Sequence, residues 1–272
     1  MRKSLTMLLV LVFISLICTQ AFAATNPEVI LEKEEIKDLN ILWQRASCGV
    51  SDIKSDIDNF RAELKNAPVN MVVEKKATTQ ILKKVKRTDG NVETYYATTF
   101  FTILKDKDKD VKKSASTLKL ASLNSVKSPI MVAASKGWDE YDDSYSIRHV
   151  GTFYYSSYRD SNTILWVRPE KVEAKWYRAD SSVSISSSRY GAEWLGYNTS
   201  GKWCGREDYS NPLPMSWGKL YTNTISNDGY INCTVAGCYV VGEQRDTLTR
   251  GGSSWEFLSC YLFGENMSAW PS

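Results

Sequence analysis

The stretch from Gly137 to Trp194 carries the most regular pattern of apolar and polar positions in this chain. Four short apolar runs are separated by turn residues, and several runs alternate between apolar and polar positions with a period of two. This period is typical of strands that bury one face and expose the other. In the first run, one face carries Ile147, His149, Gly151, Phe153 and Tyr155. A later run has on one face Val172, Ala174 and Trp176, and on the other Glu173 and Lys175.

Apolar runs of similar length continue toward the C-terminus. They recur near Tyr230, at 238–248 and at 255–263, and turn signals separate them at intervals of roughly ten residues. Such a series predicts an antiparallel β-sandwich or barrel. We therefore expect a mainly β protein whose aromatic-rich β domain covers residues 137–272.

Residues 69–104 predict a β-hairpin that precedes this domain. Asp89-Gly90 suits the tight turn of such a hairpin, and apolar positions fill both arms. The first arm carries a basic patch made of Lys83, Lys84, Lys86 and Arg87. Either this patch meets an anionic envelope polymer or phospholipid headgroups, or its lysines keep a strand edge soluble. We group residues 69–136 as a basic hairpin and linker.

The N-terminal region shows a different periodicity. Apolar residues recur every seven positions, namely Val29, Ile36, Trp43, Val50, Ile57 and Leu64. A second series follows three residues behind, namely Leu39, Ala46, Ile53 and Phe60. This heptad pattern predicts a long α-helix over residues 24–68, from Asn26-Pro27 to the stretch that ends at Pro68. Such a helix would form the seam of a homodimer or lie against the β domain.

The first residues have the features of an export signal. Arg2 and Lys3 precede an apolar run, and Ala21 and Ala23 supply the small residues of a cleavage site. We expect residues 1–23 to be a signal peptide and the mature chain to be secreted, extracellular or associated with the cell surface. No second apolar run is long enough to cross a membrane, so we expect no transmembrane span in the mature chain.

Charge and motifs narrow the classes of function. Lys and Arg number 34 against 31 Asp and Glu, a formal net charge of +3, which gives no global case for nucleic-acid binding. The chain has no glycine-rich phosphate loop of the nucleotide-binding types, and we expect no cofactor.

Five cysteines follow the signal peptide, one of them Cys48. The other four are disulfide candidates: Cys204, Cys233, Cys238 and Cys260. Export makes disulfides possible, and five cysteines allow at most two intramolecular bridges. Spacing does not choose among the pairings, and Cys48 is left as a free thiol or an intermolecular bridge. Zinc fits poorly, because one histidine cannot supply the usual second ligand pair.

Candidate catalytic groups are few. His149 is the single histidine, so a serine or cysteine hydrolase would have to use it. Its place within a strand, on the inward face, favours a packed, hydrogen-bonded side chain. The densest acidic group surrounds Asp139, Asp142 and Asp143 and could hold a metal ion or a carboxylate site, or be a solvated turn.

Nine tryptophans stand out in this composition. Trp194, Trp203 and Trp217 lie in a looser region rich in Gly, Ser and Asn, where they could form an exposed platform for sugar rings. The alternative is that tryptophans fill the core of the β domain.

The succession G-W-D, T-F-Y-Y, a tryptophan-bearing strand and W-Y-R-A-D-S-S-V-S-I resembles a family of uncharacterised secreted proteins of Gram-positive bacteria. The resemblance covers about residues 137–263. It implies an exported protein with a variable N-terminal region and a β-rich C-terminal domain, and it implies no catalytic residues.

These observations together favour a non-catalytic binding or structural module of the cell envelope. Its partner classes stay open as a cell-wall polymer, a glycan or another protein. One alternative is a carbohydrate-active hydrolase that uses carboxylates. Another is a secreted effector that binds a protein through its N-terminal helix.

Overall fold

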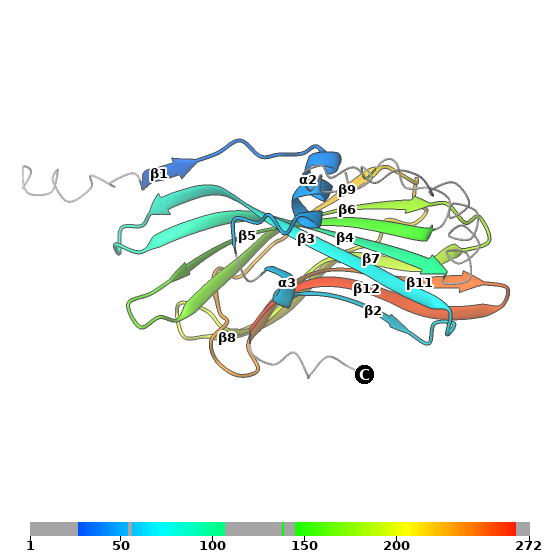
Figure 1. Cartoon of the computed structure of the whole chain (residues 1–272). Coiled ribbons are helices and arrows are strands. Elements are labelled where there is room, and N and C mark those ends of the chain that lie inside the picture. The colour runs from blue at the N-terminus through cyan, green and yellow to red at the C-terminus, as the bar shows by residue number, and fades with distance from the viewer. Residues whose placement is uncertain (1–26, 54–55, 107–137, 139–144, 265–272) are drawn as a thin grey trace, which may run out of the picture.

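The structure is a computed structural model, and it describes residues 27–53, 56–106, 138 and 145–264. Within these residues the chain is mainly β, as the alternating pattern predicts. Two antiparallel sheets lie face to face and enclose the core between them (Figure 1). A short helix lies over the outer face of the larger sheet.

The larger sheet has seven strands in the order β1-β3-β4-β5-β6-β10, with β9 also paired to β6. Its strands are β1 (Glu28–Glu32), β3 (Met71–Lys86), β4 (Val92–Asp106), β5 (Tyr145–Arg159), β6 (Leu165–Arg178), β9 (Leu220–Thr224) and β10 (Ile231–Asn232). The smaller sheet has five strands in the order β2-β12-β11-β7-β8. Its strands are β2 (Phe60–Lys65), β7 (Ser184–Tyr197), β8 (Trp203–Ser210), β11 (Tyr239–Arg250) and β12 (Ser253–Phe263).

The hairpin predicted for residues 69–104 is confirmed as β3 and β4. Asp89 and Gly90 lie in its turn, and Gly90 has a φ of 85°. The hairpin is not separate from the region that follows. β4 pairs along its length with β5, and β2 pairs with β12. The N-terminal strands therefore contribute to the same two sheets as residues 145–264.

The inward faces of the strands match the alternation in the sequence. The expected face of β5 is buried between the sheets, and Phe153 and His149 are fully buried there. On β6, Val172, Ala174 and Trp176 are likewise fully buried.

Two glycines let the sheets approach each other closely. A Cβ on Gly242 of β11 would lie 2.4 Å from the ring of Phe153 on the facing sheet. A Cβ on Gly151 of β5 would lie 2.2 Å from Phe100 on the neighbouring strand β4 and 2.7 Å from the amide oxygen of Gln244 on the facing sheet. Each side chain would overlap the aromatic ring that now fills its place.

The long N-terminal helix predicted over residues 24–68 is wrong. That region instead begins with the strand β1 and ends with the strand β2. Between them the described residues form two short helices, α2 (Leu39–Ser47) and α3 (Asp56–Asn59). The coiled-coil seam and the homodimer through this helix therefore lose their structural basis.

Local signals set the bounds of α2. The side chain of Asp38 accepts hydrogen bonds from the backbone nitrogens of Asn40 and Ile41 and caps the start of the helix. The helix ends before Gly49, which has a φ of 66°. No helix in the described part of the chain is long and apolar enough to cross a membrane.

The apolar face of α2 packs on the larger sheet. Leu42, Trp43 and Ala46 are buried against it, and the rings of Trp43 and Phe101 are 5.3 Å apart. Part of the heptad series therefore forms a genuine apolar helix face, which contacts a sheet and not a second helix.

The strand β1 covers the basic arm of the hairpin. It pairs antiparallel with the edge of β3, and Glu28 and Glu32 lie 3.7 and 3.8 Å from Lys86 and Lys83. The strand edge beside these lysines is therefore paired within the chain, and the two glutamates partly neutralise the positive charge of the lysines.

Candidate ligand-binding cleft

One end of the sandwich holds a cavity of about 410 Å³ between the two sheets. It lies where the β3–β4 and β5–β6 turns meet the C-terminal end of β12. Its lining residues are Ile53, Asn59, Val92, Thr94, Tyr96, Tyr155, Ser157, Tyr158, Arg159, Leu165 and Phe263. We call this cavity the end cleft. Its volume falls in the range of roughly 300–1,000 Å³ typical of small-molecule sites.

Strand register brings two tyrosines together in the end cleft. Tyr96 of β4 is paired with Tyr155 of β5, and both belong to the inward face. Their rings are stacked, with centroids 4.9 Å apart and planes 18° from parallel. The hydroxyl of the fully buried Thr98 donates a hydrogen bond to the Tyr155 hydroxyl at 3.4 Å.

The smaller sheet supplies the opposite wall. Phe263, near the end of β12, packs edge-on against Tyr155 at 4.7 Å. Leu165 adds an apolar side chain, while Ser157 and Arg159 add polar groups. Tyr155 is 1% exposed, so the aromatic surface of the end cleft comes from the partly buried rings of Tyr96 and Phe263. Hydroxyl and guanidinium groups beside these rings can hydrogen-bond a ligand.

The three predicted platform tryptophans do not come together. Trp194 is 1% exposed and belongs to the core between the sheets. Trp203 is 49% exposed and packs edge-on against Tyr197 at the end of the β7–β8 hairpin. Trp217 is 36% exposed and lies beneath the guanidinium of Arg178, at the opposite end of the sandwich.

The predicted metal ligands Asp139, Asp142 and Asp143 lie outside the described residues. Among the residues that the structure does describe, no group of three or more His, Cys, Asp or Glu side chains is placed to hold a metal ion.

The four disulfide candidates and Cys48 are all thiols in this structure. Cys204 and Cys238 lie next to Gly196, near the C-terminal end of β7, and Cys233 contacts the carbonyl of the neighbouring Ile231. Cys260 lies on the outer face of the smaller sheet, away from them.

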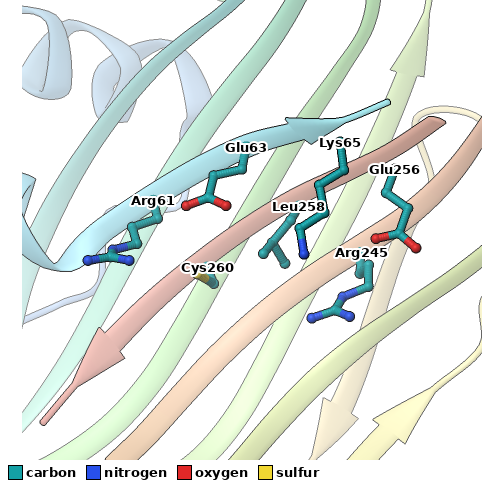
Figure 2. A pocket seen from close by; sticks show the side chains of 7 residues that line it. All are labelled: Arg61, Glu63, Lys65, Arg245, Glu256, Leu258 and Cys260. Carbon is teal, nitrogen blue, oxygen red and sulfur yellow. The ribbon is translucent and has the colours of Figure 1, made fainter. Parts of the chain in front are cut away.

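Cys260 lies at the floor of a small pocket between β2, β11 and β12 (Figure 2). The charged side chains of Arg61, Glu63 and Arg245 surround this floor. The pocket volume is about 20 Å³, which suffices for one water molecule. Burial raises the pKa of the Cys260 thiol to about 12, so this cysteine is not an activated nucleophile.

His149 is packed as expected and has no access to solvent. Its Nε2 is 2.7 Å from Oδ2 of Asp246, and its ring lies 4.4 Å from that of Phe257. A buried position within a strand keeps this residue from any substrate, so a histidine-dependent hydrolase is not built here.

A second cavity, of about 150 Å³, lies beneath residues 35–42 on the outer face of the larger sheet. At its rim the hydroxyl of Tyr154 is 2.6 Å from a Glu35 oxygen and 2.9 Å from a Glu173 oxygen. Lys171 pairs with Glu173 at 2.7 Å. No local pattern in the sequence brings Glu35 and Glu173 together, because the heptad periodicity places Glu35 in a long helix, remote from β6.

Comparison with known proteins gives no relative. No family model, no curated protein and no solved structure matches this chain. Functional inference therefore depends on the geometry of the chain itself.

Proposed function

We propose that this protein is a non-catalytic binding module that acts outside the cell or at the cell envelope, and that its ligand is a glycan. The observation that carries the proposal is the partly buried ring of Tyr96 in the wall of the end cleft, which is held in place by stacking on Tyr155, a ring that is itself 1% exposed. Location outside the cell is supported by the signal-like residues 1–23.

The chemistry of the end cleft favours sugar rings over other small ligands. A pyranose has an apolar C–H face and a rim of hydroxyl groups. Aromatic side chains pack against such a face, and neighbouring hydroxyls bind the rim. Thr94, Ser157 and Arg159 supply polar groups beside the tyrosines. Among the described residues that line this cavity there is no carboxylate, so a cationic ligand is less favoured.

The test is calorimetric titration of the full chain with soluble peptidoglycan fragments, chito-oligosaccharides and cello-oligosaccharides. We expect binding of at least one of these glycans. Tyr96→Ala is then expected to raise Kd at least tenfold, about 1.4 kcal/mol. Tyr96 suits this test because it is only partly buried.

The matched control is Trp203→Ala, which removes an exposed aromatic outside the end cleft. It should leave Kd unchanged. Loss of binding in this control alone would instead place the binding site at Trp203 and contradict the proposal. No binding to any of the three glycan classes would refute the proposal.

A second candidate function has its own observation, the pair of Glu35 and Glu173. Both contact the single hydroxyl of Tyr154, at 2.6 and 2.9 Å, so these two oxygens cannot be farther apart than about 5.5 Å, the upper end of the roughly 5–5.5 Å separation that retaining glycosidases use. The adjoining cavity is small, about 150 Å³, which limits a substrate to about one sugar ring at this position.

The hydrolase is tested with 4-nitrophenyl glycosides. If the pair is catalytic, Glu35→Gln and Glu173→Gln each abolish release of nitrophenol, while Tyr96→Ala retains it. The anomeric configuration of the first product, followed by NMR, should be retained. Absence of turnover in the unaltered chain would leave only the binding function.

A further inference from the structure

Two cysteine side chains meet at Gly196, and a third contacts the neighbouring Ile231. Cys204 faces Gly196 in the β7–β8 register, and its thiol donates to the Gly196 carbonyl at 3.4 Å. On the other side, a Cβ on Gly196 would lie 3.0 Å from the sulfur of Cys238 and 3.0 Å from the side chain of Ile231. The Cys233 thiol, in turn, donates to the Ile231 carbonyl at 3.7 Å.

Strand order limits which of these thiols can bond. Cys204 and Cys238 flank β7 from opposite sides, because the order is β8-β7-β11. Two strand spacings separate them by roughly 9.5 Å, and a disulfide joins Cα atoms no more than about 7 Å apart. Cys260 points to the outer face of the smaller sheet, and Cys48 ends α2 on the outer face of the larger one.

We propose that Cys233 and Cys238 form a disulfide bond. Only four residues separate them, and these fold back in a turn that is closed by a hydrogen bond from the Cys238 nitrogen to the Val235 carbonyl at 3.0 Å. Gly237 has a φ of 79°, which suits this turn. Both side chains are buried, at 4% and 0% exposure.

The bond would join the two sheets at this end of the sandwich. Cys233 directly follows β10 of the larger sheet, and Cys238 directly precedes β11 of the smaller one. Burial raises the pKa of the Cys204 and Cys233 thiols. Cys238 acts electrostatically on both neighbouring thiols and raises the pKa of Cys204 as well as that of Cys233.

The chemistry is a two-electron oxidation that requires a disulfide oxidant such as oxidised glutathione. One cysteine thiolate attacks a glutathione sulfur and releases one glutathione thiolate, which leaves a mixed disulfide. The second cysteine thiolate then attacks the protein sulfur and releases the second glutathione. The two cysteine protons end on the two glutathione thiols. Because both cysteines are buried in the fold, the bond forms before folding is complete.

The bond would also steady one wall of the end cleft. The Cys233 nitrogen donates to the Leu165 carbonyl at 2.8 Å, and the Leu165 nitrogen donates to the Thr234 hydroxyl at 2.8 Å. Leu165 lines the end cleft. The disulfide itself does not depend on the cleft being a binding site, so its test and the glycan titration can fail separately.

The test refolds the full reduced chain in a mixture of oxidised and reduced glutathione, then blocks free thiols and maps tryptic peptides without reduction. Cys233 and Cys238 fall in one peptide, 220–245, whereas Cys204 falls in 203–206 and Cys260 in 251–272. We expect peptide 220–245 to be lighter by two hydrogen masses and to carry no blocking group. Peptide 203–206 should carry one.

Two variants sharpen the result. Cys204→Ser should leave the change in peptide 220–245 intact, and Cys233→Ser should abolish it. Two blocked thiols in peptide 220–245, or that peptide joined to 203–206 or 251–272, would overturn the proposal. The peptide map of the unaltered chain shows whether Cys233 and Cys238 are bonded even if Cys233→Ser does not fold.

Discussion

Asp246 of β11 lies 2.7 Å from His149 of β5 and thereby joins the two sheets through a fully buried polar contact. The same carboxylate oxygen accepts a hydrogen bond from the indole nitrogen of Trp176 at 2.9 Å. A buried carboxylate is costly unless it is paired, so the two rings that meet Asp246 are needed to keep it in the core.

We predict that Asp246→Ala destabilises the fold by about 3 kcal/mol or more, because it leaves the Trp176 nitrogen without an acceptor and opens a polar cavity. Urea unfolding followed by tryptophan fluorescence measures the loss. The control is Asp228→Ala, since Asp228 is an exposed acceptor for the Trp194 indole at 3.4 Å. Asp228→Ala should lower the free energy of unfolding by no more than about 1 kcal/mol. Equal losses of this free energy in the two variants would contradict the prediction.

Gly242 permits a second cross-sheet contact, with Phe153. Gly242→Ala should destabilise the fold by about 1–3 kcal/mol, because the added methyl group would overlap the phenyl ring at 2.4 Å. Denaturant midpoints measure the effect. The double variant Gly242→Ala with Phe153→Leu tests the cause: the glycine substitution should cost less when the ring is gone. A cost that does not change would show that the ring is not what constrains this position.

Glu243 lies on the outer face of the smaller sheet and is nevertheless fully buried. Arg189 and Arg245 lie 2.9 and 3.5 Å from its oxygens. Burial raises the pKa of Glu243 above its ordinary value of 4.5, and the two guanidinium groups oppose the rise without cancelling it.

A pH dependence follows from this raised pKa. The folded carboxyl holds its proton to higher pH than the unfolded one, so its contribution is complete below pH 4.5 and is lost as the pH rises through the folded value. We predict that the unaltered chain loses free energy of unfolding relative to Glu243→Gln as the pH rises from 4.5 toward 7. Urea titrations at stepped pH measure the difference. A difference that grows in the opposite direction would show that the ion pairs dominate.

The cysteines should differ in reactivity in the folded chain. We predict that Cys48, which is exposed, reacts rapidly with an alkylating reagent at neutral pH, whereas Cys260 reacts only on unfolding. The reason is that Cys260 is 1% exposed and burial raises its pKa to about 12. Peptide mapping after short exposure measures both sites, and adding urea provides the control. Early modification of Cys260 would show that its pocket opens in solution.

The faces of β5 and β6 were predictable because alternation is a local property. Phe153 and Trp176 could be assigned to the interior from their neighbours alone, since successive side chains of a strand point to opposite faces. The turn at Gly90 was predictable for the same reason, because its backbone conformation is favoured by the residues that form it.

The N-terminal prediction failed because its pattern was compatible with two structures. Phe60 and Leu64 are four residues apart, which places them on one face of a helix and equally on one face of a strand. These residues form a strand because β2 hydrogen-bonds along β12 and buries Phe60 in the core. A single helix without a partner would have offered no comparable burial.

The end cleft could not be predicted from the sequence. Tyr96 and Phe263 line one cleft although they are far apart in the chain, and only the pairing of strands and the facing of sheets brings them together. By itself the sequence determined which residues alternate and where the chain turns, because these depend on near neighbours. The tertiary structure decided which faces meet, because that depends on burial and backbone pairing between distant segments.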